Sequence, residues 1–259
     1  MSNAHPAVPL ARVAGPGERP FDLFREVLAA RQLEQWLPDE PVRILDLSVG
    51  SPRLLAVLAE PGHRVISVRA PGVRPTDAAP AIDGSSEVQV VSADARSLDW
   101  MATESVDIVV AEGGMLSTAL AAELTVADLF RVLRPGGRLL LSADSLLAGL
   151  AALADQGRWA ELADVPAADV VLVPETGPEG VRRCFWPEEL HGILIEAGFT
   201  VDWIRPRTVL TAETVDRALT LDPSQLDRLV ATELALSARR QGESIGSVLV
   251  ASARRPAHV

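Results

Sequence analysis

Residues Val42 to Pro52 read VRILDLSVGSP, an apolar run that ends in an acid and then turns through a glycine. The run Arg43 to Leu47 is typical of a buried strand. Gly50 gives the turn a permissive backbone, and Ser51 and Pro52 suit the N-cap and the first position of a helix. The stretch therefore predicts a strand, a turn and a helix at the carboxyl edge of a parallel sheet, where ligands bind.

Strand and helix candidates alternate along the rest of the chain, a pattern that indicates right-handed crossovers and a parallel sheet. The expected further strands are Arg64 to Val68, Val88 to Val91, Val106 to Ala111, Arg138 to Ser142, Val201 to Arg205 and Ser247 to Ser252. The expected helices are Phe21 to Leu37, Pro52 to Glu60, Ala119 to Leu133 and Trp186 to Gly198, with one or two more in Thr211 to Arg240.

The composition limits the classes of function. The chain has 259 residues, of which 48% are hydrophobic and 23% charged, and these values predict one large globular domain. The net charge of -11, with arginines dispersed among acids, argues against a nucleic-acid partner and favours a neutral or cationic small molecule. The chain contains no lysine and no tyrosine, which excludes Schiff-base chemistry and a tyrosine acid.

Cysteine and histidine usage bounds the compartment and the metal chemistry. Cys184 is the only cysteine, so neither an intrachain disulfide nor a cysteine-based zinc site is available, and the four histidines show no metal-ligand spacing. The sequence has no apolar run of about 18 residues and no secretion signal pattern. We therefore expect a cytoplasmic protein with no metal site, no membrane partner and no nucleic-acid partner.

Two segments resemble class I S-adenosylmethionine-dependent methyltransferases. The family pattern D-x-G-x-G-x-G falls on Asp46, Ser48, Gly50 and Pro52, so one of its three glycines is kept. Residues Asp128 to Leu141, DLFRVLRPGGRLLL, are similar to the helix, turn and fifth strand of the family, where Pro135 would end the helix and two glycines would reverse the chain. The resemblance implies a Rossmann-like α/β methyltransferase fold with S-adenosylmethionine as cofactor. Its sheet would be seven-stranded and mostly parallel, with an antiparallel last strand and helices on both faces.

On this resemblance the chain forms a single methyltransferase-like domain over residues 1–259. Residues 1–20 would be a loose arm, 21–37 an N-terminal helix, and 40–145 the cofactor-binding half. Residues 146–184 interrupt the alternating pattern and are expected to form an inserted lid over the ligand site. Residues 185–259 would complete the sheet, and a homodimer is a possible assembly.

The resemblance also assigns roles at the carboxyl edge of the sheet. The expected cofactor-binding residues are Asp46, Ser48, Gly50, Arg69, Asp94, Ala95, Glu112 and Gly113, and the candidate catalytic residues are Glu112 and Asp144. Asp94 would accept a hydrogen bond from the adenine amino group, or would instead form an Asx turn with its own backbone. Glu112 would lie beside the sulfonium, or would be a solvated loop acid. Asp144 would contact the acceptor, or would cap the helix that follows.

Arg69 departs from the family pattern, because the second strand should end in an acid that accepts hydrogen bonds from both ribose hydroxyls. A guanidinium group has donors and no acceptor, so it cannot replace that acid. Asp77 or Asp83 in the next loop could take over, or the ligand could differ and carry a phosphate, as in NADP-binding folds. A surface arginine paired with a neighbouring acid is the simpler alternative.

Three functions follow from these observations. The first is methylation of an oxygen, nitrogen or carbon atom of a small molecule, in which most of the catalysis comes from positioning. The second is a methyltransferase-like protein that has lost methylation and acts as a binding or regulatory partner. The third is an NADP-dependent reductase that uses Arg69 for the extra phosphate; Asp46 at the strand end argues against it.

Overall fold

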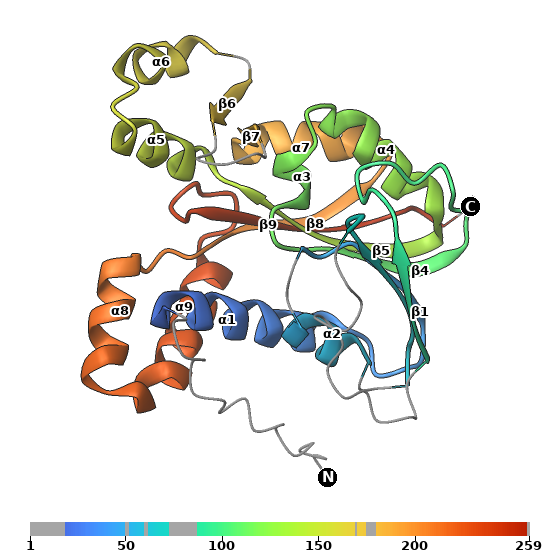
Figure 1. The fold of residues 1–259 in the computed structure, drawn as a ribbon. Helices are drawn as coiled ribbons and strands as arrows, with labels where there is room; N and C mark the ends of the chain where they lie inside the picture. Colours follow the sequence, from blue (N-terminus) through green and yellow to red (C-terminus); the bar gives the residue numbers. More distant parts are fainter. Residues whose placement is uncertain are drawn as a thin grey trace.

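A seven-stranded sheet forms the centre of the computed structural model, which describes residues 19–49, 52–59, 62–72, 87–168, 170–174 and 180–257 (Figure 1). Its strand order is β3-β2-β1-β4-β5-β9-β8. The strands are β1 Arg43–Asp46, β2 Arg64–Arg69, β3 Glu87–Ser92, β4 Val106–Ala111, β5 Leu133–Asp144, β8 Thr200–Arg207 and β9 Val248–Arg254. Strands β1 to β5 pair in parallel, whereas β9 runs antiparallel to both β5 and β8. The predicted sheet with an antiparallel last strand is confirmed.

Helices cover both faces of the sheet (Figure 1). One face carries α1 Pro20–Trp36, α2 Pro52–Ala59, α8 Ala212–Leu221 and α9 Leu226–Arg239, with a 3-10 turn at Pro223–Gln225 between the last two. The other face carries α3 Met115–Thr118, α4 Ala122–Val132 and α7 Pro187–Glu196. The N-terminal half of α1 packs against α8 and α9 through Phe24, Val27 and Val215, so the helices before β9 extend the same layer.

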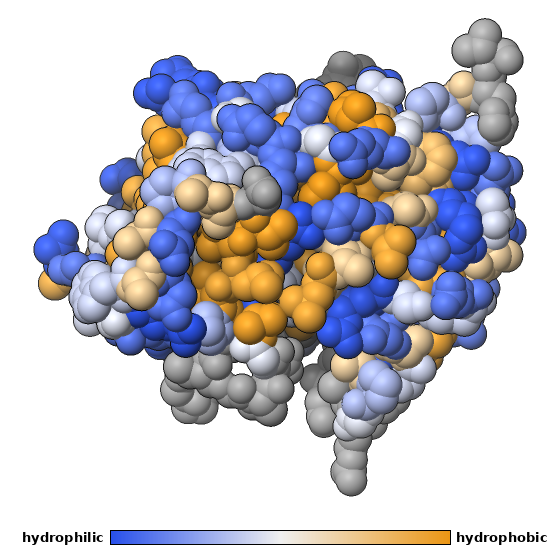
Figure 2. Space-filling view, turned by 90° about the horizontal axis from the view of Figure 1, so that it is seen from above, coloured by the Kyte–Doolittle hydropathy of each residue, from blue (hydrophilic) through white to orange (hydrophobic). Residues whose placement is uncertain are grey.

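The segment predicted to be an inserted lid has its own small core. It contains α5 Leu146–Asp155, α6 Trp159–Asp164, a 3-10 turn at Val165–Ala167 and a hairpin of β6 Val171–Pro174 with β7 Val181–Cys184. Figure 2 looks onto this side of the molecule and shows apolar side chains gathered among polar ones. Leu147 and Leu172 from the segment, and Trp186 just after it, are each more than two-fifths exposed. The closure of this segment over a ligand stays a prediction.

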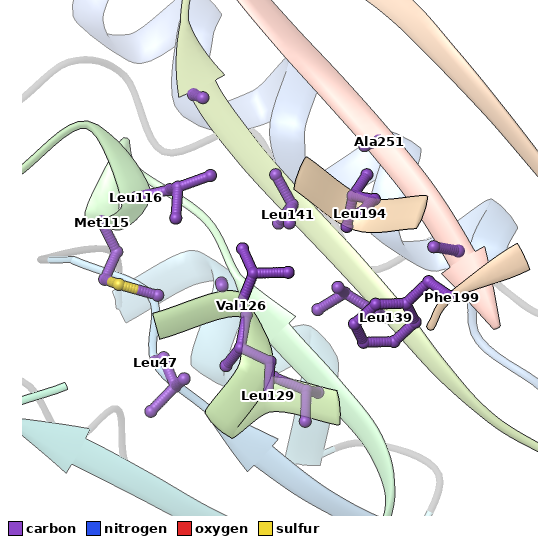
Figure 3. Packing of buried hydrophobic residues seen from close by; sticks show 14 of the residues in the cluster. Leu47, Met115, Leu116, Val126, Leu129, Leu139, Leu141, Leu194, Phe199 and Ala251 are labelled. Carbon is purple, nitrogen blue, oxygen red and sulfur yellow. The ribbon is translucent and has the colours of Figure 1, made fainter. Parts of the chain in front are cut away.

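The largest core cluster lies between the sheet and the α4 and α7 layer. Figure 3 shows Leu139 and Leu141 of β5 beside Val126 and Leu129 of α4, all of which are fully buried. Leu140 points to the opposite face and belongs to the cluster beneath α1 and α2. Because successive residues of a strand face opposite sides, a sheet covered on both faces needs continuous apolar strands, which is the pattern that the sequence shows.

The Pro-Gly-Gly segment differs from its prediction. Helix α4 ends at Val132, one residue before its predicted end, and β5 begins at once at Leu133, so the glycines bend the chain within the strand and not in a turn before it. Instead, the β4–β5 register shifts between the Val106–Leu133 and Ile108–Arg138 pairs. Pro135 has no N–H for a regular ladder. A Cβ atom on Gly137 would lie 2.8 Å from the Arg134 carbonyl oxygen, so the chain passes here without room for a side chain.

The described residues show no membrane or metal feature. Every helix in these ranges is too short or too polar to span a bilayer. In the same ranges, no group of three or more His, Cys, Asp or Glu side chains is arranged to hold a metal ion.

His63, at the entrance to β2, makes the stability depend on pH. The residue is fully buried, its Nδ1 accepts the Val42 N–H at 3.1 Å, and its Nε2 has no partner in the described part of the chain. Burial lowers the pKa of His63 below its ordinary 6.5. The unfolded chain therefore binds more protons than the folded chain between the lowered pKa and 6.5, so the free energy of unfolding falls as pH falls through this window.

We expect His63→Asn to keep the acceptor for Val42 and to remove this pH dependence. Between about pH 7.5 and about pH 5.5 the wild type should lose on the order of 1 kcal/mol more than the variant in urea unfolding. His191→Asn, at an exposed position of α7, is the control and should behave as the wild type does. Equal pH dependence in His63→Asn and the wild type would contradict the assignment.

Candidate functional site

The turn after β1 is held together from inside by Asp46. This side chain is fully buried; one carboxylate oxygen accepts the Ser48 N–H at 2.9 Å and the other accepts the Ser67 hydroxyl of β2 at 2.7 Å. The Ser48 hydroxyl oxygen accepts the Glu112 N–H at 3.4 Å, which joins the turn to the end of β4. Asp46 and Ser48 therefore fix the shape of the turn, and both of the Asp46 oxygens have partners within the protein.

Arg69, at the end of β2, is folded into the protein. Its side chain is 7% exposed, and Nη1 donates to the carbonyl oxygens of Ser48 at 3.0 Å and Val68 at 3.2 Å. Nη2 lies 3.5 Å from a carboxylate oxygen of Asp46. The Nε–H is buried and has no partner among the residues described. The alternative of a surface arginine is therefore wrong, because the guanidinium lies against the turn itself.

Asp94 follows β3 and remains accessible. Its side chain is 49% exposed and pairs with Arg96, whose Nε and Nη2 donate to the two carboxylate oxygens at 2.9 and 2.8 Å. The Arg96 N–H also donates to Asp94, at 2.9 Å, which is the contact expected of an Asx turn. The hydrogen bond from the Arg96 side chain lowers the pKa of Asp94. Ala95 is partly buried against the main core.

Glu112, just after β4, forms a buried ion pair with Arg207 at the end of β8. The Glu112 side chain is 1% exposed, and its two oxygens accept from Nη1 and Nη2 of Arg207 at 3.0 and 2.6 Å. Nη1 also donates to Gln32 of α1 at 3.2 Å. Burial raises the pKa of Glu112, but the charge and hydrogen bonds of Arg207 outweigh it and the pKa lies below its ordinary value. Such a carboxylate is a poor proton acceptor, so the geometry favours a positioning role.

The backbone around Arg207 is strained and braced. Thr208 has φ +64°, in the left-handed region that a β-branched residue rarely adopts. Glu233 of α9 is fully buried and accepts the N–H groups of Val209 at 2.7 Å and Leu210 at 3.0 Å. A Cβ atom on Gly246 would lie 2.3 Å from the Arg207 carbonyl oxygen, so glycine is needed there. The segment between β8 and β9 thus holds Arg207 toward Glu112.

A cavity of about 250 Å³ opens beside this ion pair. It is lined by Asp22, Arg25, Glu26, Ala29, Val49, Leu54, Glu112, Gly113, Arg207, Thr208 and Val248. The lining residues come from α1 and α2, from the ends of β4 and β8, from the start of β9 and from the turn after β1. The lining combines acids, arginines and apolar side chains, so the cavity suits a small polar ligand.

Gly113 brings the end of β4 against the turn. Its φ is +80°, and a Cβ atom would lie 2.9 Å from the Val49 carbonyl oxygen. The Val49 N–H donates to the Glu112 carbonyl oxygen at 3.0 Å, so the two segments remain paired beyond their strands. The structure thus brings together five of the predicted site residues, namely Asp46, Ser48, Arg69, Glu112 and Gly113.

Asp144 belongs to a different cluster. It ends β5, its N–H donates to the Ser117 hydroxyl at 2.7 Å, and its carboxylate accepts from Arg182 of the β6–β7 hairpin at 2.5 Å. Ser145, and not Asp144, caps α5, because its hydroxyl oxygen accepts the Ala148 N–H at 3.4 Å. The capping alternative for Asp144 is therefore wrong. Glu112 is tied to α1 and Asp144 to the opposite layer of the sheet, so the two predicted catalytic acids do not act on one another.

Four residues of the prediction, Gly50, Ser51, Asp77 and Asp83, lie outside the described residues. Among the residues that are described, Asp94 suits the adenine of the implied cofactor, whereas the end of β2 does not offer an acceptor for its ribose. Asp94 offers exposed acceptor oxygens next to β3. At the end of β2, however, the only ionic side chain is Arg69, which cannot accept from the ribose hydroxyls. An acceptor for the ribose would therefore have to come from outside the described residues, where Asp77 and Asp83 lie.

Comparison with known proteins supports the same family. Residues 45–141 match a family model described as a methyltransferase domain, and no curated protein sequence matches the chain. A Burkholderia thailandensis 1,6-didemethyltoxoflavin N1-methyltransferase, solved with its substrate and S-adenosylhomocysteine, is 19% identical, with a TM-score of 0.54, over 97% of this chain and 98% of that one. A Mesorhizobium loti S-adenosylmethionine-dependent methyltransferase is 17% identical, with a TM-score of 0.54, over 88% and 96%.

The same fold also occurs in the [4+2]-cyclase SpnF, which is 18% identical, with a TM-score of 0.57, over 95% of this chain and 84% of that one. These identities establish the fold, and the family model adds the match at the β1 to β5 half of the sheet. The resemblance in the sequence is thus confirmed: residues 45–141 match a methyltransferase domain, and the chain has the fold of S-adenosylmethionine-dependent methyltransferases.

Proposed function

We propose that the protein transfers a methyl group from S-adenosylmethionine to a small polar molecule. The observation that carries this proposal is the cavity of about 250 Å³ against Val49 and Gly113, at the carboxyl edge of β1 and β4. Its volume suits a small ligand, because pockets that hold drug-sized ligands measure roughly 300 to 1,000 Å³ and this cavity is slightly smaller. A polymer substrate would need an open surface instead. We propose in addition that the protein works in the cytoplasm, without nucleic-acid or membrane partners.

In this proposal the residues of the cavity position the acceptor. S-Adenosylmethionine supplies a methyl group that is already activated on a sulfonium, so orientation can provide most of the acceleration. Glu112 and Arg207 neutralise one another and form a rigid wall, while Asp22 and Arg25 are exposed at the α1 side of the cavity. Charges of both signs favour an acceptor that carries polar or charged groups.

Isotope-labelled methyl transfer tests the proposal directly. The protein would be incubated with S-adenosylmethionine carrying a labelled methyl group and a mixture of small metabolites, and labelled products would be sought by mass spectrometry. Val49 is 57% exposed and lines the cavity, so Val49→Trp should narrow it and lower product formation by about tenfold or more. Leu221→Trp, on α8 at a position that is 81% exposed, is the matched control and should leave the rate unchanged. The absence of any labelled product would overturn the proposal.

A second candidate function is a binding protein that no longer methylates, and Arg69 is the observation that favours it. Its guanidinium stands where the family has an acid, and the fold is shared with a protein described as a cyclase. On this reading S-adenosylhomocysteine at millimolar concentration should give no heat of binding with the wild type in calorimetry, and no labelled product should form. Binding together with product formation would exclude the second candidate.

A further inference from the structure

We propose that Arg69 is an internal competitor for the cofactor. Its guanidinium occupies the place at the end of β2 that a ribose would take, and it must leave before an adenosine ligand can bind there. This inference rests on the proposed use of S-adenosylmethionine. It goes beyond that function because it assigns to the chain a built-in contact that limits access to its own site.

Arg69 stands at the strand end where nucleotide-binding sheets place an acid for the ribose. In open parallel sheets that bind nucleotides, an acid about 20 residues after the first turn accepts a hydrogen bond from the ribose. Arg69 lies at that place, two positions beyond Ser67, which is the register partner of Asp46. Its side chain then runs back across the edge of the sheet to the Ser48 carbonyl oxygen at 3.0 Å. The Arg69 guanidinium therefore lies against the turn after β1.

The charge and the hydrogen-bond donors of Arg69 also act against the binding of a ribose at this place. The nearby Asp46 carboxylate compensates the buried guanidinium, so the protein does not need an anionic ligand to neutralise Arg69. All hydrogens of a guanidinium are donors, and both ribose hydroxyls would face donors rather than an acceptor. A cofactor bound in the usual place would find no carboxylate for these hydroxyls at the end of β2 among the described residues, which leave out Asp77 and Asp83. Arg69 thus opposes the cofactor both by volume and by chemistry.

The Nε–H of Arg69, which has no partner among the described residues, lowers the cost of moving the side chain outward. A buried donor without an acceptor costs free energy, and this Nε has no partner in the part of the chain that the structure describes. Moving the side chain into solvent would satisfy that donor while breaking the bonds to Ser48 and Val68. The inward position is therefore held by its Nη contacts alone, and replacement of the side chain should release the site.

Calorimetric titration with S-adenosylhomocysteine tests the proposal on four proteins. Arg69→Ala removes the competitor and should bind at least about tenfold more tightly than the wild type. Arg69→Asp also restores an acceptor and should bind more tightly than Arg69→Ala. Arg64→Ala is the matched control, because Arg64 begins the same strand and pairs with Glu87 at an exposed position; its affinity should equal that of the wild type.

Two further results keep the proposal falsifiable. If Arg69→Ala or Arg69→Asp fails to fold, as judged by circular dichroism, Arg69→Gln retains a side-chain donor for Ser48 and should still bind more tightly than the wild type. If the wild type binds as tightly as the folded Arg69 variants, or more tightly, the competitor role is overturned while the proposed function stands. If no folded variant binds at all, both are overturned.

Discussion

Replacing Glu112 by alanine will lower the free energy of unfolding by about 3 to 5 kcal/mol, because the variant leaves the Arg207 guanidinium buried without its carboxylate. Both side chains are less than a tenth exposed, and two hydrogen bonds of 3.0 and 2.6 Å join them. Urea unfolding at neutral pH measures the loss. Asp94→Ala is the control, because it breaks an exposed pair with Arg96 and should cost less than about 1 kcal/mol.

A double variant separates the cost of the unpaired charge from the value of the pair. Glu112→Leu combined with Arg207→Met replaces both partners by apolar groups, and such replacements are often neutral or stabilising. We expect the double variant to be more stable than Glu112→Ala. If the double variant were as unstable as the single one, the loss would come from packing around Glu112, and the ion-pair explanation would fail.

The stability difference between the wild type and Glu112→Ala should depend on pH in one direction only. The folded pKa of Glu112 lies below its ordinary value of 4.5, because the interactions with Arg207 outweigh burial. The pair therefore contributes stability that is present above pH 4.5 and is lost as pH falls through the lower, folded pKa. The difference in stability between the wild type and Glu112→Ala should be constant near neutrality and should shrink only in acid.

The sheet was predictable from the sequence because a strand that is buried on both faces has apolar residues at successive positions. Runs that are apolar at nearly every position, such as Val106 to Ala111 with Asp107 as its one polar residue, predict strands whether or not their neighbours are known, and this one has the predicted bounds. Strand β7 was not predicted, since it reads Val-Arg-Arg-Cys and has no apolar pattern. Its arginines are accommodated by acids from elsewhere: Arg182 pairs with Asp144, and Arg183 pairs with Glu123 and Glu189.

The site was predictable only in part, because its decisive contacts join distant residues. Glu112 follows β4 and could be placed at the edge of the sheet, but its partner Arg207 lies 95 residues further along the chain. No local pattern distinguishes Arg207 from a surface arginine. The departure at Arg69 could be seen in the sequence, whereas the direction of its side chain depends on the carbonyl oxygen of Ser48, 21 residues away.

Replacing Gly113 by alanine will lower the free energy of unfolding by about 2 to 4 kcal/mol, from backbone strain and a steric clash together. Its φ of +80° disfavours any residue with a Cβ atom, and that atom would lie 2.9 Å from the carbonyl oxygen and 3.2 Å from the nitrogen of Val49. Both contacts are to backbone, so relief requires the turn after β1 to move away from β4. Thermal and urea unfolding of the variant measure the cost.

Gly136→Ala separates the cost of backbone strain from the cost of the steric clash. Gly136 also has φ +80°, but nothing lies within 4 Å of a Cβ atom built there, so this variant carries the conformational strain alone and should lose only about 1 to 2 kcal/mol. Equal losses in the two variants would mean that the turn yields to the added methyl group at no cost. A larger loss in Gly113→Ala, together with weaker ligand binding, would show that the cavity depends on the close approach of Gly113 to Val49.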